Sequence, residues 1–225
     1  MTNTFFQILR PGVNTTMQDT GRNHLYHIGV TISGAIDQRN YKLANSLTDN
    51  KLNDTVIEFA YQGPLLRLNN GKINFAITGD IFFNIIRNNS MIEEGKCYQN
   101  YILNDGEQID VISTKKSIYG YLSVNGGFEL EEMWKSCSIN TKAQIGPNNG
   151  KKYSINEKIF IKKSTIKNIK YNVLIIGASQ GIGKHLFDML KINKKIIKIV
   201  TYHKNIIKIK SKKIIVKKID VLKEK

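Results

Sequence analysis

The spacing of apolar residues changes near residue 162, and this change divides the chain between two kinds of fold. Up to that position, short apolar runs are separated by turn dipeptides such as Asn70-Gly71 and Asn149-Gly150. Runs at this spacing are typical of an antiparallel barrel or sandwich. Beyond residue 170 the order becomes strand, glycine-rich turn, helix and strand, which is typical of a parallel βαβ unit. The sequence therefore predicts a mainly-β part over residues 1–162, a linker over 163–170 and a short, incomplete α/β part over 171–225.

The first part is predicted to contain eight strands and one helix. The helix begins after Asp37, because Tyr41, Ala44 and Leu47 recur at helical spacing and the Asp37 carboxylate can accept from the first-turn N–H groups. The predicted strands are Phe5–Leu9, Val56–Phe59, Leu65–Leu68, Ile73–Thr78, Ile81–Ile86, Gln108–Ile112, Tyr119–Val124 and Lys158–Ile161.

Positive charge is concentrated in the second part. The net charge of +16 divides into 17 basic and 15 acidic residues over 1–162, against 17 basic and 3 acidic residues over 163–225. Such a tail is found in proteins that bind nucleic acid or anionic membranes. Few aromatic residues accompany the lysines, and a bias of the proteome toward Lys, Ile and Asn explains them equally well, so nucleic acid is not favoured as a partner.

Membrane insertion and secretion are not predicted. No run of about 18 apolar residues is present, and the first residues lack the pattern of a secretory signal. Cys97 and Cys137 lie far apart in the sequence, which favours free thiols and a cytoplasmic location.

Several ordered motifs in the first part resemble one known family. The segment Ile8-Leu-Arg-Pro-Gly-Val-Asn-Thr-Thr-Met-Gln-Asp-Thr-Gly-Arg22 is similar to the opening signature of the family that contains allophanate hydrolase subunit 2 and the C subunit of 5-oxoprolinase. The blocks that follow in the same order are Gly29-Val-Thr-Ile-Ser-Gly-Ala-Ile-Asp37, Ala44-Asn45, Asn50, Glu58, Gly63-Pro64, Tyr121-Leu-Ser-Val-Asn-Gly-Gly127 and Ser136-Cys-Ser138.

This resemblance, over residues 5–162, implies a cyclophilin-like β-barrel and a partner protein of the type known as subunit 1 or the B subunit in this family. It implies ATP-dependent cleavage of 5-oxoproline, with ATP acting through the complex, or biotin-dependent carboxyl transfer to a small amide such as urea. That chemistry needs donors for an amide carbonyl or oxyanion, for which backbone N–H groups at Ser33-Gly34 and Gly126-Gly127 are candidates. Asp37 and Glu58 are the candidates for orienting an amide nitrogen or transferring a proton.

Each of these residues also has a structural interpretation. Asp37 is a candidate helix cap, and Gly126-Gly127 a candidate tight turn. Gln18, Asp19 and Arg22 are candidates for a buried polar network that fixes the first turn of the barrel. His24 and His27 lack further ligand residues nearby in the sequence, so no metal site is predicted.

The second part resembles the opening of a short-chain dehydrogenase/reductase over residues 171–225. Its Gly177, Gly181 and Gly183 follow a predicted strand and open a predicted helix, as a pyrophosphate-binding turn requires. Ser179 and Ile182 lie in the same turn, and Asp220 follows a third strand, at the family's position beside the adenine. No carboxylate follows the second strand, where Lys204 suits a 2′-phosphate, so NADP is preferred to NAD. A solvated Lys204 is the alternative.

These two resemblances support three interpretations. The first is a truncated, cytoplasmic subunit of a 5-oxoprolinase / carboxyltransferase-type complex, because the family's second barrel is absent here. The second is an NADP-binding reductase fragment with a β-barrel binding module. The third is a non-functional gene fusion. No Tyr-x-x-x-Lys occurs in the chain, so hydride transfer by this chain alone is not expected.

Overall fold

The computed structural model describes residues 3–163, 171–175, 196–202 and 214–218. Contacts divide the chain into two compact units, Met1–Ile166 and Lys167–Lys225.

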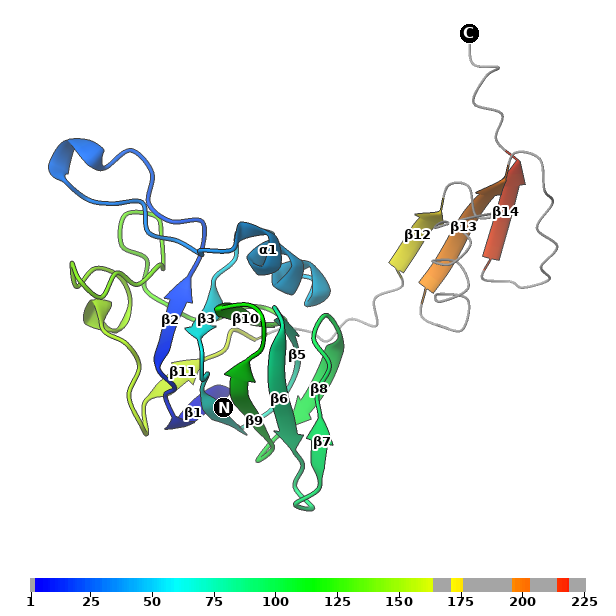
Figure 1. The fold of residues 1–225 in the computed structure, drawn as a ribbon, viewed down its shortest axis with the longest axis horizontal. Coiled ribbons are helices and arrows are strands. Elements are labelled where there is room, and N and C mark those ends of the chain that lie inside the picture. The colour runs from blue at the N-terminus through cyan, green and yellow to red at the C-terminus, as the bar shows by residue number, and fades with distance from the viewer. Residues whose placement is uncertain (1–2, 164–170, 176–195, 203–213, 219–225) are drawn as a thin grey trace, which may run out of the picture. The chain divides into compact units, whose positions relative to one another are not determined.

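The first unit is built on two antiparallel sheets (Figure 1). The six-stranded sheet has the order β11-β1-β4-β9-β6-β7, with β11 Lys158–Phe160, β1 Phe5–Arg10, β4 Leu65–Asn69, β9 Gln108–Thr114, β6 Ile81–Ile86 and β7 Ile92–Glu94. The five-stranded sheet has the order β2-β3-β10-β5-β8, with β2 Asn14–Gln18, β3 Val56–Ala60, β10 Tyr119–Val124, β5 Lys72–Thr78 and β8 Asn100–Asn104. This confirms the mainly-β prediction.

The main core fills the space between the sheets. Successive side chains of a strand point to opposite faces, so alternate residues enter this core. Strand β1 contributes Phe6 and Ile8, and β9 contributes Ile109 and Val111, all of them buried. At about 25 cal/mol per Å² of apolar area, this burial is the main force that holds the two sheets together.

The five-stranded sheet is covered on its outer face as well. Helix α1, Gln38–Leu47, packs on β10, β5 and β3, as Figure 1 shows. A second, smaller apolar cluster lies beneath this helix and includes Tyr41, Ala44 and Tyr121. Every residue of β3 is therefore buried, including Glu58. Two short 3-10 helices, η1 Tyr26–Ile28 and η2 Asn148–Gly150, lie in the connecting loops.

All eight predicted strands of the first unit are present, with bounds that differ by at most two residues at either end. Strands β2, β7 and β8 were not predicted. Strand β2 is mostly polar, β7 is three residues long, and β8 has Asn at both ends. None of the three has the alternating apolar pattern that identifies a strand.

The second unit contains a parallel sheet in the order β12-β13-β14, with β12 Tyr171–Ile175, β13 Ile196–Tyr202 and β14 Ile214–Lys218. The predicted helix from Gly181 to about Leu190 lies outside the described residues, and so does most of the predicted linker. The Rossmann-like segment therefore stays a prediction. Among the described residues, no helix has the length and apolar character needed to cross a membrane.

Candidate functional site

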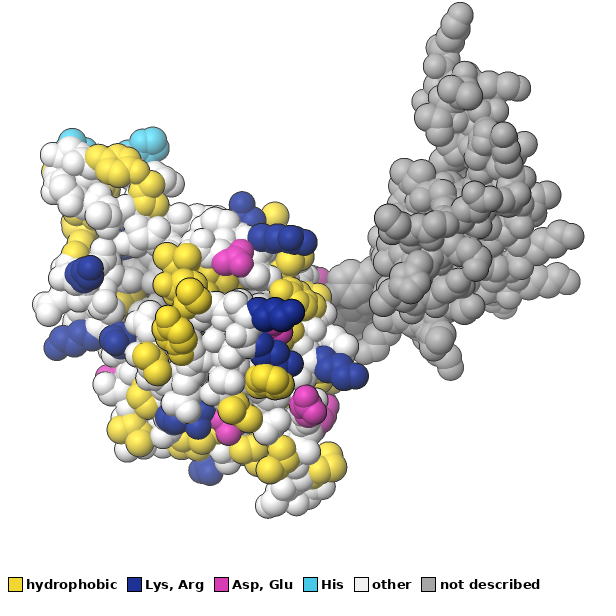
Figure 2. Space-filling view, viewed as in Figure 1, with side chains coloured by type: hydrophobic (Ala, Val, Ile, Leu, Met, Phe, Trp, Pro, Cys, Tyr) yellow, Lys and Arg dark blue, Asp and Glu magenta, His cyan; other side chains and the backbone are white. Residues whose placement is uncertain are grey.

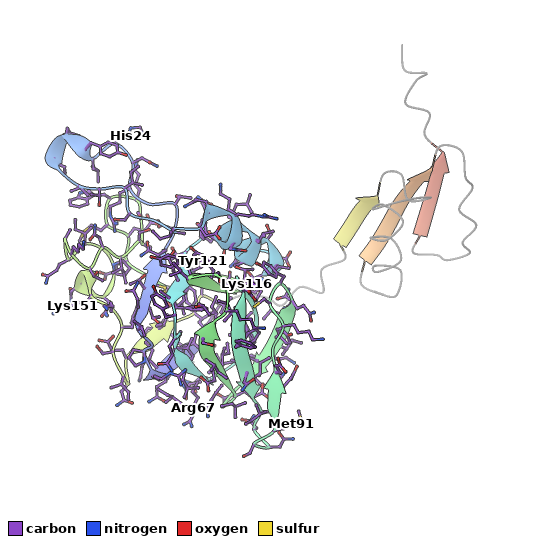
Figure 3. The ribbon with its side chains drawn as sticks, in the orientation of Figure 1. His24, Arg67, Met91, Lys116, Tyr121 and Lys151 are labelled. Atoms are coloured by element: carbon purple, nitrogen blue, oxygen red, sulfur yellow. The ribbon has the colours of Figure 1, made fainter. Side chains whose placement is uncertain are left out.

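Glu58 and Tyr121 form a buried pair on the outer face of the five-stranded sheet. They are directly opposite each other in the antiparallel register of β3 and β10. Both side chains point away from the main core, toward α1 and the loop that precedes it. Glu58 is 4% exposed and Tyr121 is fully buried. In Figure 3, Tyr121 lies well inside the first unit, whereas His24 lies at the tip of a projecting loop.

Two consecutive backbone N–H groups of the loop before α1 hold this pair. The Ile36 N–H donates to the Glu58 carboxylate at 2.8 Å, and the Asp37 N–H donates to the Tyr121 hydroxyl oxygen at 2.6 Å. The Tyr121 hydroxyl in turn donates to Glu58. Burial raises the pKa of Glu58, although these hydrogen bonds oppose the shift. Burial, with the nearby Glu58 carboxylate, also raises the pKa of Tyr121, so the phenol stays protonated.

Asp37 caps helix α1. Its Oδ1 accepts from the N–H groups of Arg39 and Asn40, each at 3.0 Å, and its Oδ2 accepts from the Asn40 side-chain amide at 2.7 Å. The predicted cap is therefore confirmed. Because Asp37 is only partly buried, its carboxylate is more accessible than that of Glu58.

The predicted polar network around the first turn is also present, and its centre is Asp19. The Asp19 Oδ1 accepts from the Gly21 N–H at 2.7 Å and from the hydroxyls of Ser136 and Ser138 at 2.7 and 2.6 Å. Its Oδ2 accepts from the Cys137 N–H at 2.6 Å. These contacts fasten the end of β2 to the Ser136–Ser138 segment, which lies more than 115 residues away in the sequence.

Arg22 and Gln18 complete this network with backbone contacts. Arg22 is 1% exposed, and its guanidinium donates to the carbonyls of Ser138 and Met133. Burial lowers the pKa of Arg22, although Asp19 opposes the shift. The Gln18 amide donates to Ile139 O at 3.0 Å. The network therefore holds the 133–139 segment against the edge strand β2.

Ser33 and Gly34 connect the Asp19 network to the Glu58 pair. The Ala35 N–H donates to Asp19 O at 2.9 Å, and the Asn140 amide donates to the Ser33 hydroxyl at 3.3 Å. Gly34 has a φ of +91°, and a Cβ there would lie 2.9 Å from Gly21 N. The backbone of residues 20–21 therefore occupies the space that the missing side chain leaves at Gly34.

Gly126 and Gly127 form a tight turn whose N–H groups have acceptors within the protein. Gly126 donates to the Asn50 side-chain oxygen at 2.9 Å, and Gly127 donates to Val124 O at 3.0 Å. The Asn50 amide also donates to Val124 O at 2.7 Å. In this conformation both N–H groups stabilise the turn.

The structure brings four of the six predicted catalytic residues together: Ser33, Gly34, Asp37 and Glu58. Sequence reasoning missed the role of Tyr121 in holding Glu58. The signal was available for Glu58, because it is the charged residue of an otherwise apolar predicted strand, and a buried carboxylate needs a hydrogen-bond partner. The predicted nucleotide-binding residues Gly177, Ser179, Gly181, Ile182, Gly183, Lys204 and Asp220 lie outside the described residues.

The two-sheet architecture with one outer helix is also found in solved structures of other proteins. A solved structure with this fold is the urea carboxylase of Kluyveromyces lactis, with a TM-score of 0.67 and 21% identity, over 78% of this chain and 17% of that chain. Residues 28–185 match the carboxyltransferase domain family, subdomains A and B. The chain belongs to this family.

Two curated relatives agree with this assignment. The C subunit of 5-oxoprolinase from Haemophilus influenzae is 32% identical over 131 residues, which are 58% of this chain and 41% of that protein. The urea amidolyase of Lachancea kluyveri is 29% identical over 157 residues, which are 69% of this chain and 8% of that protein. The chain thus spans less than half the length of these relatives.

The family match extends beyond the predicted boundary at residue 162. It ends at residue 185 and so includes Gly177, Gly181 and Gly183. The glycine-rich segment is therefore covered by the carboxyltransferase family, and its resemblance to short-chain dehydrogenases stays a prediction.

Proposed function

We propose that the chain is a subunit of an ATP-dependent amide-processing complex of the 5-oxoprolinase or allophanate hydrolase type. The observation that carries this proposal is the family match over residues 28–185. The similarity to a 5-oxoprolinase component and to a urea amidolyase supports an amide as the substrate. The relative from Haemophilus influenzae is named as a subunit, which supports a partner of the subunit 1 type.

Within such a site, Asp37 is the proposed contact for the amide nitrogen. Its carboxylate is partly exposed and is fixed by three hydrogen bonds at the start of α1. Glu58 and Tyr121 are proposed as positioning residues, because they accept hydrogen bonds from the N–H groups of Ile36 and Asp37 and so fix the backbone at Asp37. Correct placement of one carboxylate can account for a large part of a rate enhancement. The partner would supply the remaining groups and the ATP site.

The test compares the purified chain with and without its partner in an assay of ATP- and 5-oxoproline-dependent glutamate release. We expect the partner to bind and the chain alone to give no turnover, because half of a shared site does not position both reactants. Turnover by the chain alone would contradict the proposal.

The role of Asp37 is tested with Asp37→Asn in the same mixture. Asn is as good a helix cap as Asp, so this change removes the charge and leaves α1 in place. If the mixture turns over, we expect Asp37→Asn to abolish activity at unchanged thermal stability. Glu129→Gln, an exposed change of the same kind, is the matched control. An equal loss of turnover in both variants would show that Asp37 is not part of the site.

A second candidate function is NADP binding by the second unit. The observation that favours it is the parallel strand order β12-β13-β14, which is compatible with one half of a dinucleotide-binding sheet. Titration of the chain with NADPH and NADH tests this proposal. We expect tighter binding of NADPH and its selective loss in Lys204→Glu, because a carboxylate would repel the 2′-phosphate. Equal affinity for both nucleotides would refute the preference.

A further inference from the structure

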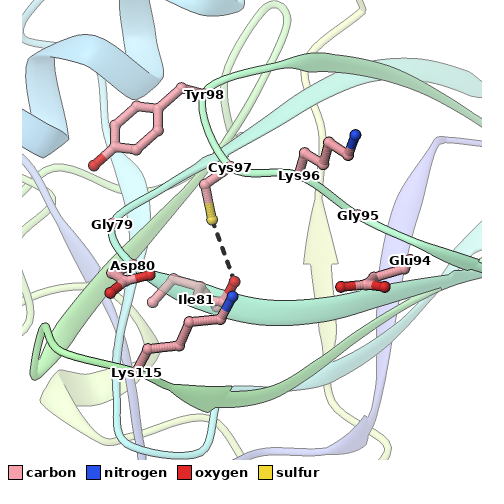
Figure 4. Close-up of a pocket in the computed structure, with 9 residues that line it drawn as sticks. All are labelled: Gly79, Asp80, Ile81, Glu94, Gly95, Lys96, Cys97, Tyr98 and Lys115. Carbon is pink, nitrogen blue, oxygen red and sulfur yellow. Dashed lines mark hydrogen bonds between the residues drawn. The ribbon is translucent and has the colours of Figure 1, made fainter.

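A pocket of about 340 Å³ opens on the first unit away from the predicted catalytic residues, none of which lines it. Its walls come from the β5–β6 turn, the β7–β8 loop and the residue that follows β9. Figure 4 shows the Lys115 ammonium between the carboxylates of Asp80 and Glu94, with the Cys97 thiol above it. This volume lies in the lower range of small-molecule sites.

Four charged side chains line this pocket: Asp80, Glu94, Lys96 and Lys115. The ion pairs Arg10–Asp110, Arg87–Glu93 and Arg87–Glu107 lie among the described residues, and none of them uses these four. The Lys115 ammonium lies 3.6 Å from the centroid of the Phe82 ring, a contact that holds this group without neutralising its charge. The pocket therefore presents two positive and two negative groups that do not form ion pairs with one another. Elsewhere on the face drawn in Figure 2, Lys and Arg are scattered rather than gathered in one basic patch.

The β7–β8 wall is fixed in place by the protein itself. The Gly95 N–H donates to Phe83 O at 2.9 Å, and the Tyr98 N–H donates to Ile77 O at 2.8 Å. A Cβ at Gly95 would overlap the Phe83 ring, so this wall lies directly against the core. A wall held in this way keeps its shape without a ligand, which lowers the entropic cost of binding.

We propose that this pocket binds a small zwitterion, an α-amino acid, with its carboxylate toward Lys115 and its ammonium group toward Asp80 or Glu94. A simple anion would be repelled by the two carboxylates, and a simple cation by the two lysines. A molecule with both charges meets an opposite charge at each end. The Cys97 thiol donates to Ile81 O and adds a neutral surface between the charges.

The pocket also has a direct connection to α1. The Tyr98 hydroxyl donates to the Asn40 side-chain oxygen at 2.9 Å, and the Asn40 amide donates to Asp37. A ligand that contacts Tyr98 therefore lies two hydrogen bonds away from the cap of the helix. The inference does not rest on the proposed amide-processing function, because binding is measured on the chain without any partner.

Calorimetric titration of the full chain with L-alanine, L-glutamine and L-glutamate tests the proposal, with acetate and methylammonium as single-charge analogues. We expect at least one amino acid to bind saturably, and both analogues to bind about tenfold or more weakly, because each lacks one charge-assisted contact. Acetate binding as tightly as the amino acids would show an anion site. No saturable binding by any of the three amino acids would also overturn the proposal.

Two variants separate the pocket from general surface charge. Lys115→Gln should weaken binding by about tenfold or more, whereas Lys116→Gln, one residue outside the pocket, should leave it within about twofold. Equal effects of both changes would refute the site. Labelling of Cys97 by an aromatic disulfide gives an independent measurement, because bound ligand should slow this reaction, and Cys97→Ser supplies the background rate from the buried Cys137. An unchanged labelling rate at saturating amino acid would place the ligand elsewhere.

Discussion

Removal of the Asp19 carboxylate should strongly destabilise the first unit. Asp19→Ala takes the acceptor away from four donors: two backbone N–H groups and two serine hydroxyls. The hydroxyls of Ser136 and Ser138 can rotate toward other acceptors. The N–H groups of Gly21 and Cys137 are fixed by the backbone and would stay buried without a partner.

The magnitude follows from this count. Each buried donor without an acceptor costs about 1–3 kcal/mol, so the two fixed N–H groups together cost about 2–6 kcal/mol. A domain of this kind has a total stability of about 5–15 kcal/mol, so the variant should be marginally folded. Asp19→Asn keeps one acceptor oxygen for Gly21, Ser136 and Ser138 but presents an NH₂ group to the Cys137 N–H. The unfavourable contact between this NH₂ group and the Cys137 N–H replaces the loss of four hydrogen bonds. It should lower the free energy of unfolding by about 1–3 kcal/mol.

Urea unfolding monitored by circular dichroism measures both variants against the unchanged chain. The expected order of stability is the original chain, then Asp19→Asn, then Asp19→Ala, with similar slopes against urea concentration. Asp105→Asn is a control, because this exposed carboxylate accepts one hydrogen bond at the surface. A cost below about 1 kcal/mol for Asp19→Ala would refute the reasoning, since it would show that the buried donors find other partners.

Three further predictions concern Glu58, the glycines and the unit boundary. Burial raises the pKa of Glu58 in the folded protein, so folding favours the protonated side chain. This contribution to stability is complete below the ordinary carboxyl pKa of about 4.3. It is lost as the pH rises through the higher pKa of the folded protein. Urea titrations across this interval should show the original chain losing stability relative to Glu58→Gln, and a constant difference would contradict the assignment. Gly34→Ala should lower the stability of the first unit more than Gly127→Ala, because φ is positive at both positions but only a Cβ at residue 34 would meet other atoms. Equal midpoints of urea unfolding for the two variants would exclude a steric cause. Trypsin should cut first between residues 162 and 171 and leave a folded core of about residues 1–162, whereas preferred cutting within 30–150 would refute the boundary.

Local sequence patterns were sufficient for the strands that line the main core and for α1. Strands such as β6 and β9 bury alternate apolar residues, because one face of each packs against the opposite sheet. Helix α1 was predictable from Asp37 and from its apolar spacing, since capping and periodicity both act within one or two turns. The polar strand β2 was missed because its buried residues are covered by the 136–140 segment, which no local pattern reveals.

The candidate residues themselves were identified from the sequence, but their roles depend on contacts that only the folded chain creates. Glu58 meets Tyr121 because the register of β3 and β10 places them opposite each other. The turn at Gly126 is held by Asn50, which is 76 residues away in the sequence. The charged pocket combines the β5–β6 turn, the β7–β8 loop and Lys115, which follows β9. The sequence by itself determined eight strands of the first unit and helix α1, because the preferences that form them are local. The tertiary structure decided which polar groups are paired and which charged side chains line one pocket, because those arrangements depend on strand register and on loops that meet only after the sheets have packed.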